Sequence, residues 1–97
     1  MKRVPNELAE KIGWPKNAAG TLTFHGPKHV YISLFAADKK LLRRVVRGLL
    51  REGYGVIIPR ALLPDIRPLR IAGFYDATFW LNGRKIEVWR VDPKQEV

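Results

Sequence analysis

Residues 38–52 read DKKLLRRVVRGLLRE, and this stretch determines the centre of the predicted fold. At 3.6 residues per turn, its aliphatic residues fall on one side of a helix and its basic residues on the other. Asp38 is suited to cap the first turn, and Gly53 to end the helix. We expect the aliphatic side to be buried. The basic residues of the opposite side are Lys39, Lys40, Arg43, Arg44, Arg47 and Arg51.

This basic side of the helix carries charge of a single sign, because no acid lies between Asp38 and Glu52. Exposed helix faces usually mix signs, since opposite charges four residues apart support each other and like charges repel. A face of one sign therefore favours an anionic partner. The alternative is a highly soluble outer face, as in a protein from a thermophile, and the helix alone does not separate the two.

The composition points in the same direction. The chain has 97 residues, which suits one domain spanning 1–97, and its 18 Lys and Arg against 9 Asp and Glu give a net charge of +9. Such an excess favours nucleic acid or an anionic surface over acidic protein partners. A hydrophobic content of 46% excludes a disordered basic tail. The sequence holds no long apolar run and no cysteine, so we expect a cytoplasmic protein with no membrane partner and no thiolate chemistry.

Strand patterns flank the helix on both sides. A first hairpin is predicted over 21–24 and 29–35 around Gly26-Pro27, and a third strand over 54–60. Asn82-Gly83 between 74–81 and 84–91 is the strongest hairpin signal in the chain. The remaining predictions are a short helix over 4–12, a loop or a turn of helix over 61–71, and fraying over 92–97. The fold class is α+β, a single small domain with an antiparallel sheet of two hairpins plus a middle strand, packed against the basic amphipathic helix.

Few residues suggest catalysis. His25 and His29 bracket the first turn and could face each other, but a zinc site needs more ligands, and no Cys, Asp or Glu lies nearby in sequence. Phosphate-binding loops and the common hydrolase motifs are missing. We therefore predict no catalytic residue, no metal and no cofactor, although folding could still bring Asp65, Asp76 or Glu87 together.

The second hairpin offers a further surface. A two-residue loop would place Trp80 opposite Lys85, with Trp89 on the same face, and two indoles beside a lysine could stack on bases. The alternative is that this face packs against another element or a second subunit, as in a homodimer. Candidate nucleic-acid contacts outside the basic helix are Lys28, His29, Tyr31, Arg84 and Lys85.

The order of helix, hairpin, helix and strands resembles one half of a LAGLIDADG homing endonuclease. KNAAGTLTF at 16–24 looks like the end of the signature helix of that family, and residues 30–54 are similar to the strand and helix that follow. The position that matches the metal-binding acid of the family is Ala19, and Pro15 interrupts the signature helix. The resemblance therefore implies a protein that binds DNA without cutting it, through its sheet.

A second resemblance is to AbrB-type swapped-hairpin transcription factors. VPNELAEKIG at 4–13 looks like their entry from strand to helix, and IPRALLPDI at 58–66 looks like a second copy, each followed by a hairpin. Pro64 and Pro68 depart from the pattern in that second copy. This resemblance implies a fused pseudo-dimer joined by the basic helix.

The predicted function is non-catalytic nucleic-acid binding, with double-stranded DNA favoured over RNA. Two other classes stay open. One is a small interaction or structural protein, such as a ribosomal, viral or host-takeover factor, that binds an acidic protein surface. The other is a nuclease of the LAGLIDADG type, which would require a metal site lined by carboxylates.

Overall fold

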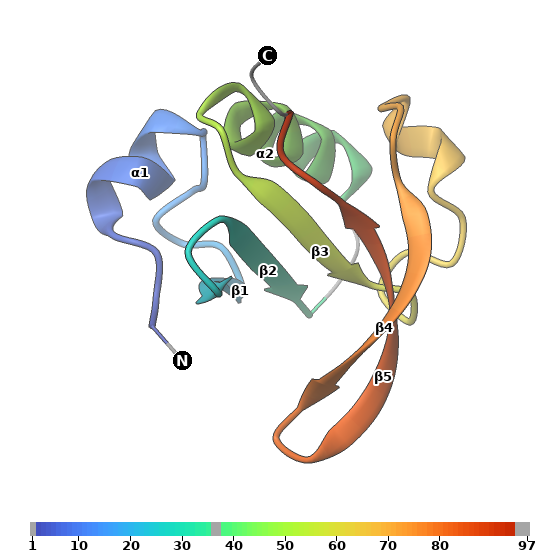
Figure 1. Cartoon of the computed structure of the whole chain (residues 1–97). Coiled ribbons are helices and arrows are strands. Elements are labelled where there is room, and N and C mark those ends of the chain that lie inside the picture. The colour runs from blue at the N-terminus through green and yellow to red at the C-terminus, as the bar shows by residue number, and fades with distance from the viewer. Residues whose placement is uncertain (1, 36–37, 95–97) are drawn as a thin grey trace.

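The centre of the fold is helix α2, Lys39–Arg51, as the sequence predicts. The Asp38 carboxylate caps it by accepting a hydrogen bond of 3.1 Å from the backbone N–H of Leu41. In the computed structural model, which describes residues 2–35 and 38–94, α2 lies across one face of a five-stranded sheet (Figure 1). The main core lies between the two, and the α2 residues that are completely buried in it are Leu42, Val45, Val46 and Leu49.

The other elements follow the predicted order with small shifts in their bounds. They are helix α1 (Asn6–Lys11), strands β1 (Gly20–His25), β2 (His29–Leu34) and β3 (Gly55–Pro59), the 3-10 helix η1 (Arg67–Leu69), and strands β4 (Tyr75–Leu81) and β5 (Arg84–Val91). The α+β class, the two hairpins and the middle strand are confirmed.

The sheet is mixed, and the prediction of an antiparallel sheet was wrong. Its strand order is β1-β2-β3-β5-β4. Strands β2 and β3 are parallel, whereas the other neighbouring pairs are antiparallel. The physical reason is the connection: α2 carries the chain back along the sheet, so β3 starts at the same end as β2. β3 is buried from Gly55 to Ile58, as expected for a central strand covered on both faces.

The second face of the sheet curls over a smaller core. Tyr31 of β2 and Phe79 of β4 are separated by two strands, which would place them roughly 14 Å apart in a flat sheet. Their ring centroids lie 5.3 Å apart, so the sheet is strongly curved. Tyr31, Ile57 and Val88 form this second core beneath the β4–β5 hairpin, which twists away from α2 (Figure 1).

The β4–β5 hairpin has the predicted register. Leu81 pairs with Arg84 and Trp80 with Lys85. Asn82 and Gly83 have φ values of 52° and 77°, the left-handed conformation that a tight two-residue loop requires. The turn chemistry of two residues therefore sets the face on which every side chain of the hairpin lies.

The end of helix α1 packs closely against α2 at Gly48, which has no side chain. A Cβ at Gly48 would lie 2.8 Å from the Cβ of Ile12, so glycine allows the end of α1 to approach α2 this closely. Lys11 also forms an ion pair of 2.8 Å with Glu52 at the end of α2. These contacts fix α1, and the segment that follows it, against the basic helix.

Candidate nucleic-acid interface

Four basic residues line up along the exposed side of α2. Successive members are four, three and four residues apart, which places them in one row over about 16 Å of helix. All four are exposed, and no ion pair or hydrogen bond to them is found among residues 2–35 and 38–94. We call this row the α2 stripe, and it consists of Lys40, Arg44, Arg47 and Arg51.

Arg43 does not belong to the stripe. Its guanidinium donates hydrogen bonds to the carbonyl oxygens of Pro68, at 2.6 Å, and Leu69, at 3.1 Å. The prediction that this side chain faces solvent was wrong, because the segment 61–71, which the sequence left undefined, folds back beside α2. Arg43 therefore holds η1 in place.

Lys39 is exposed but lies to the side of the stripe. The pKa of Asp65 is lowered mainly by hydrogen bonds from Arg67, with a smaller contribution from the charge of Lys39. The charge of Lys39 therefore acts on an acid of the same chain, so we do not count Lys39 in the stripe.

Most acids of the described chain are paired with basic residues outside the stripe. Arg60 binds both Asp76, at 3.1 Å, and Glu87, at 3.3 Å. Arg67 binds Asp65 at 2.9 Å. Folding therefore does bring Asp76 and Glu87 to one place, around an arginine, and leaves Asp65 apart from them. Within residues 2–35 and 38–94, no group of three or more His, Cys, Asp or Glu side chains is arranged to hold a metal ion.

The predicted nucleic-acid contacts outside α2 do not lie together in the fold. Lys28 is exposed in the β1–β2 turn, and Arg84 and Lys85 are exposed at the tip of the β4–β5 hairpin. Figure 1 shows this tip far from α2, so the hairpin cations do not extend the stripe. Tyr31 is only 8% exposed, and the prediction that it reaches a ligand was wrong because the curled sheet covers it with Phe79.

His29 is also occupied within the protein. Its Nε2 lies 2.9 Å from Oδ1 of Asp92. The same carboxylate accepts hydrogen bonds from Arg90 at Oδ1 (3.1 Å) and from the Tyr75 hydroxyl at Oδ2 (2.8 Å). These bonds, with that of His29 first, lower the pKa of Asp92 to about 2. Fraying from residue 92 onward was therefore a wrong prediction for Asp92 itself, while residues 95–97 lie outside the described chain. A Cβ at Gly55 would lie 2.6 Å from the His29 ring, so glycine there makes room for the imidazole.

His25 and His29 pair across the first turn, as predicted, but their side chains contact different groups. The His25 ring lies 5.0 Å from Phe79 and 5.5 Å from Tyr31. Burial among these rings lowers the pKa of His25, and its Nε2 has no hydrogen-bond partner in the described structure. His25 therefore lies among the aromatic rings beside the second core.

The two tryptophans of the hairpin have different roles. Trp89 packs against the main core, donates from Nε1 to the Leu63 carbonyl at 2.7 Å, and lies beneath the Arg60 guanidinium at 5.2 Å. The alternative that this face packs against another element is thus confirmed for Trp89. Trp80 is 67% exposed.

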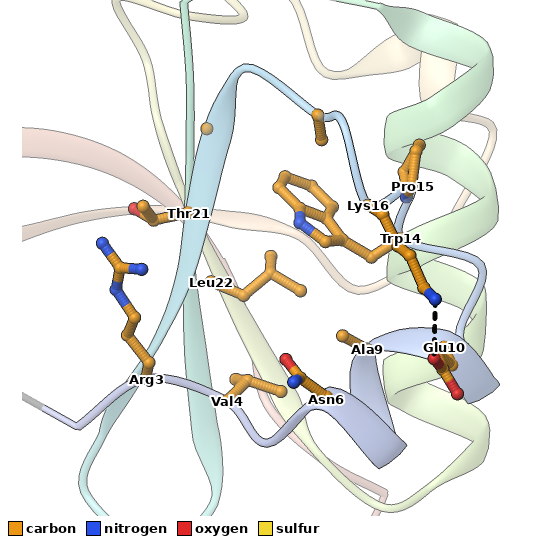
Figure 2. Close-up of a pocket in the computed structure, with 12 residues that line it drawn as sticks. Arg3, Val4, Asn6, Ala9, Glu10, Trp14, Pro15, Lys16, Thr21 and Leu22 are labelled. Atoms are coloured by element: carbon orange, nitrogen blue, oxygen red, sulfur yellow. Dashed lines mark ion pairs between the residues drawn. The ribbon is translucent and has the colours of Figure 1, made fainter.

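The cavity beside the Trp14 ring is a feature that the sequence does not predict. This ring lines a cavity of about 470 Å³ between α1, the segment 14–18 and β1, and Figure 2 shows it directed toward β1. The cations at the cavity are Arg3 and Lys16. The sequence signal available was an aromatic residue between basic residues and next to a helix end, which is weak without the fold.

The chain was compared with protein-family models, curated proteins and solved structures, and none matched. Among the helices within 2–35 and 38–94, none has the length and apolar character needed to cross a membrane.

Proposed function

We propose that the protein binds nucleic acid without cutting it, through the α2 stripe, and that it prefers double-stranded DNA to RNA. The observation that carries the proposal is the row of four exposed basic residues without an internal partner in the described chain. Such a row is a site of high positive potential, and phosphate groups neutralise it with release of counterions.

The preference for DNA rests on the shape of the stripe. An exposed helix fits the major groove of B-form DNA, which is about 12 Å wide, whereas the major groove of A-form RNA is too narrow and deep for side chains to read. The hairpin tip with Arg84 and Lys85 and the turn with Lys28 lie elsewhere on the surface, so we assign them a weaker, auxiliary role.

The salt dependence of binding to a 20-base-pair DNA duplex tests the proposal. Four neutralised phosphates predict a slope of about −3.6 for the logarithm of the binding constant against the logarithm of the salt concentration. Fluorescence anisotropy across a salt series measures this slope. Affinity that does not change with salt, or no binding at low salt, would remove the nucleic-acid proposal.

A matched pair of double variants locates the site. Lys40→Gln with Arg47→Gln removes two charges from the stripe and should reduce the magnitude of the slope by about 2. Arg84→Gln with Lys85→Gln removes the same charge at the hairpin tip and should leave the slope nearly unchanged. The opposite ranking would move the interface to the hairpin. An RNA duplex of the same sequence should bind more weakly than the DNA.

A further inference from the structure

The cavity beside Trp14 has the features of a ligand site. Its volume of about 470 Å³ falls in the range of small-molecule sites, roughly 300–1,000 Å³. It lies along the outer edge of β1, the first strand of the sheet order, where residues 2–4 pair with residues 22–24 through an isolated bridge between Arg3 and Thr23. In Figure 2 the Trp14 ring lies beside Leu22 and faces β1, with Arg3 and Lys16 toward opposite ends of the lining.

Trp14 is suited to stack on a flat ring. It is half-buried and packs against the main core, so the core holds the indole in place while its remaining surface lines the cavity. The other tryptophans differ, because Trp89 is covered by Arg60 and Trp80 is 67% exposed. Stacking on a pre-positioned aromatic ring is the usual way in which proteins bind an unpaired base.

The charged side chains that line the cavity are Arg3, Lys16 and Glu10, so its net charge is positive and favours an anionic ligand. Among described residues Arg3 has no ion pair, and Lys16 has only a long one of 3.9 Å to Glu10. The Leu22 carbonyl accepts from the Val4 N–H at 3.0 Å, so the peptide groups of Leu22 point away from β2. Since both groups of a strand residue point to the same side, the Leu22 N–H also faces the cavity edge.

The cavity is next to the α2 stripe. A Cβ at Gly13 would lie 3.1 Å from Cδ of Arg44, so the stem of this stripe residue runs along the backbone directly before Trp14. Arg44 is therefore the stripe residue that links the stripe to the segment carrying Trp14.

We propose that the Trp14 cavity binds one unstacked nucleotide of the nucleic acid that lies on the stripe, with the base on the indole and its two flanking phosphates near Arg3 on one side and Lys16 on the other. This proposal rests on the proposed function and adds to it a preference for nucleic acid that has an unpaired end or loop next to a duplex.

The experiment compares three probes on the full chain: a blunt DNA duplex, the same duplex with a three-nucleotide single-stranded overhang, and that overhang with abasic sites. The wild type should bind the overhang probe about tenfold more tightly than the blunt duplex, because base–aromatic stacking has an effect of this order. The abasic overhang keeps every phosphate and should lose the preference. Trp14→Ala should lose it too, Trp14→Phe should retain most of it, and Trp80→Ala should leave it unchanged.

The outcomes distinguish failure of the Trp14 cavity from failure of the α2 stripe. Blunt-duplex binding with no preference for the overhang overturns the cavity and leaves the stripe intact. A preference that persists with the abasic probe, or in Trp14→Ala, also overturns the cavity, because the selection is then for charge or for another tryptophan. If Trp14→Ala does not fold, the abasic probe on the wild type and the Trp14→Phe variant decide. No binding to any probe removes both proposals.

Discussion

Arg43 and Arg47 are neighbours on one helix, yet the structure predicts opposite consequences for their loss. Arg43→Gln removes two hydrogen bonds from a charged donor, to Pro68 at 2.6 Å and to Leu69 at 3.1 Å. A hydrogen bond to a charged group contributes about 1.5–3 kcal/mol, and the freed carbonyls of this half-buried site regain part of that from water, so we expect a total loss of about 2 kcal/mol. For a domain of this size that is a fall in melting temperature of roughly 8–16 °C.

Arg47→Gln should change the unfolding free energy by less than about 0.5 kcal/mol, because the side chain is exposed and has no partner in the described chain. The order reverses for DNA: Arg47→Gln should lower the magnitude of the salt slope by about 1, and Arg43→Gln should leave it unchanged. Thermal unfolding followed by circular dichroism and anisotropy titrations measure the two effects. Equal melting temperatures, or a reduced slope in Arg43→Gln, would refute the assignment of Arg43 to the fold and Arg47 to the interface.

Three further results are expected. Leu49→Ala, at a completely buried position, should destabilise the protein by about 2–4 kcal/mol in urea unfolding, and a loss below 1 kcal/mol would show that α2 is loosely packed. The pKa of Asp92 is about 2 in the folded protein, below its ordinary 3.8, so its stabilising effect is complete above about pH 4 and is lost as the pH falls toward 2. The stability difference between wild type and Asp92→Asn should therefore shrink over that range, and a constant difference would contradict the role of the carboxylate. Finally, supercoiled plasmid incubated with excess protein and magnesium or manganese should stay intact, whereas nicking that disappears in Asp76→Asn would restore the nuclease alternative.

The elements that the sequence predicts are those set by neighbours in the chain. The two-sided pattern of 38–52, its Asp38 cap and the Asn82-Gly83 loop act over a few residues, so helix α2 and the β4–β5 register are confirmed. The direction of β3 was wrong because it depends on where α2 returns the chain, and no local pattern records that.

In the candidate site, too, the sequence predicts what depends on local spacing and misses what depends on distant contacts. Helical spacing alone predicts the exposure of Lys40 and Arg47. It does not show that Arg43 reaches carbonyls about 25 residues further along the chain, or that Tyr31 lies beneath a strand with which it does not pair. The Trp14 cavity is lined by residues within 3–22, yet it also escapes the sequence, because its shape depends on how α1, the segment after it and β1 pack together.

The strand order also has a consequence for synthesis on the ribosome. Of the described strands β5 emerges last, and it inserts between β3 and β4, so β4 has no place in the sheet until residues 84–91 have left the exit tunnel. During that interval the apolar edge of β3 is open to pairing with other chains, which is the usual route to misassembly of nascent sheets. A nascent chain that stalls before β5 therefore exposes an unpaired, apolar strand edge. The tight Asn82-Gly83 loop shortens this interval, because β5 can fold back on β4 as soon as it emerges.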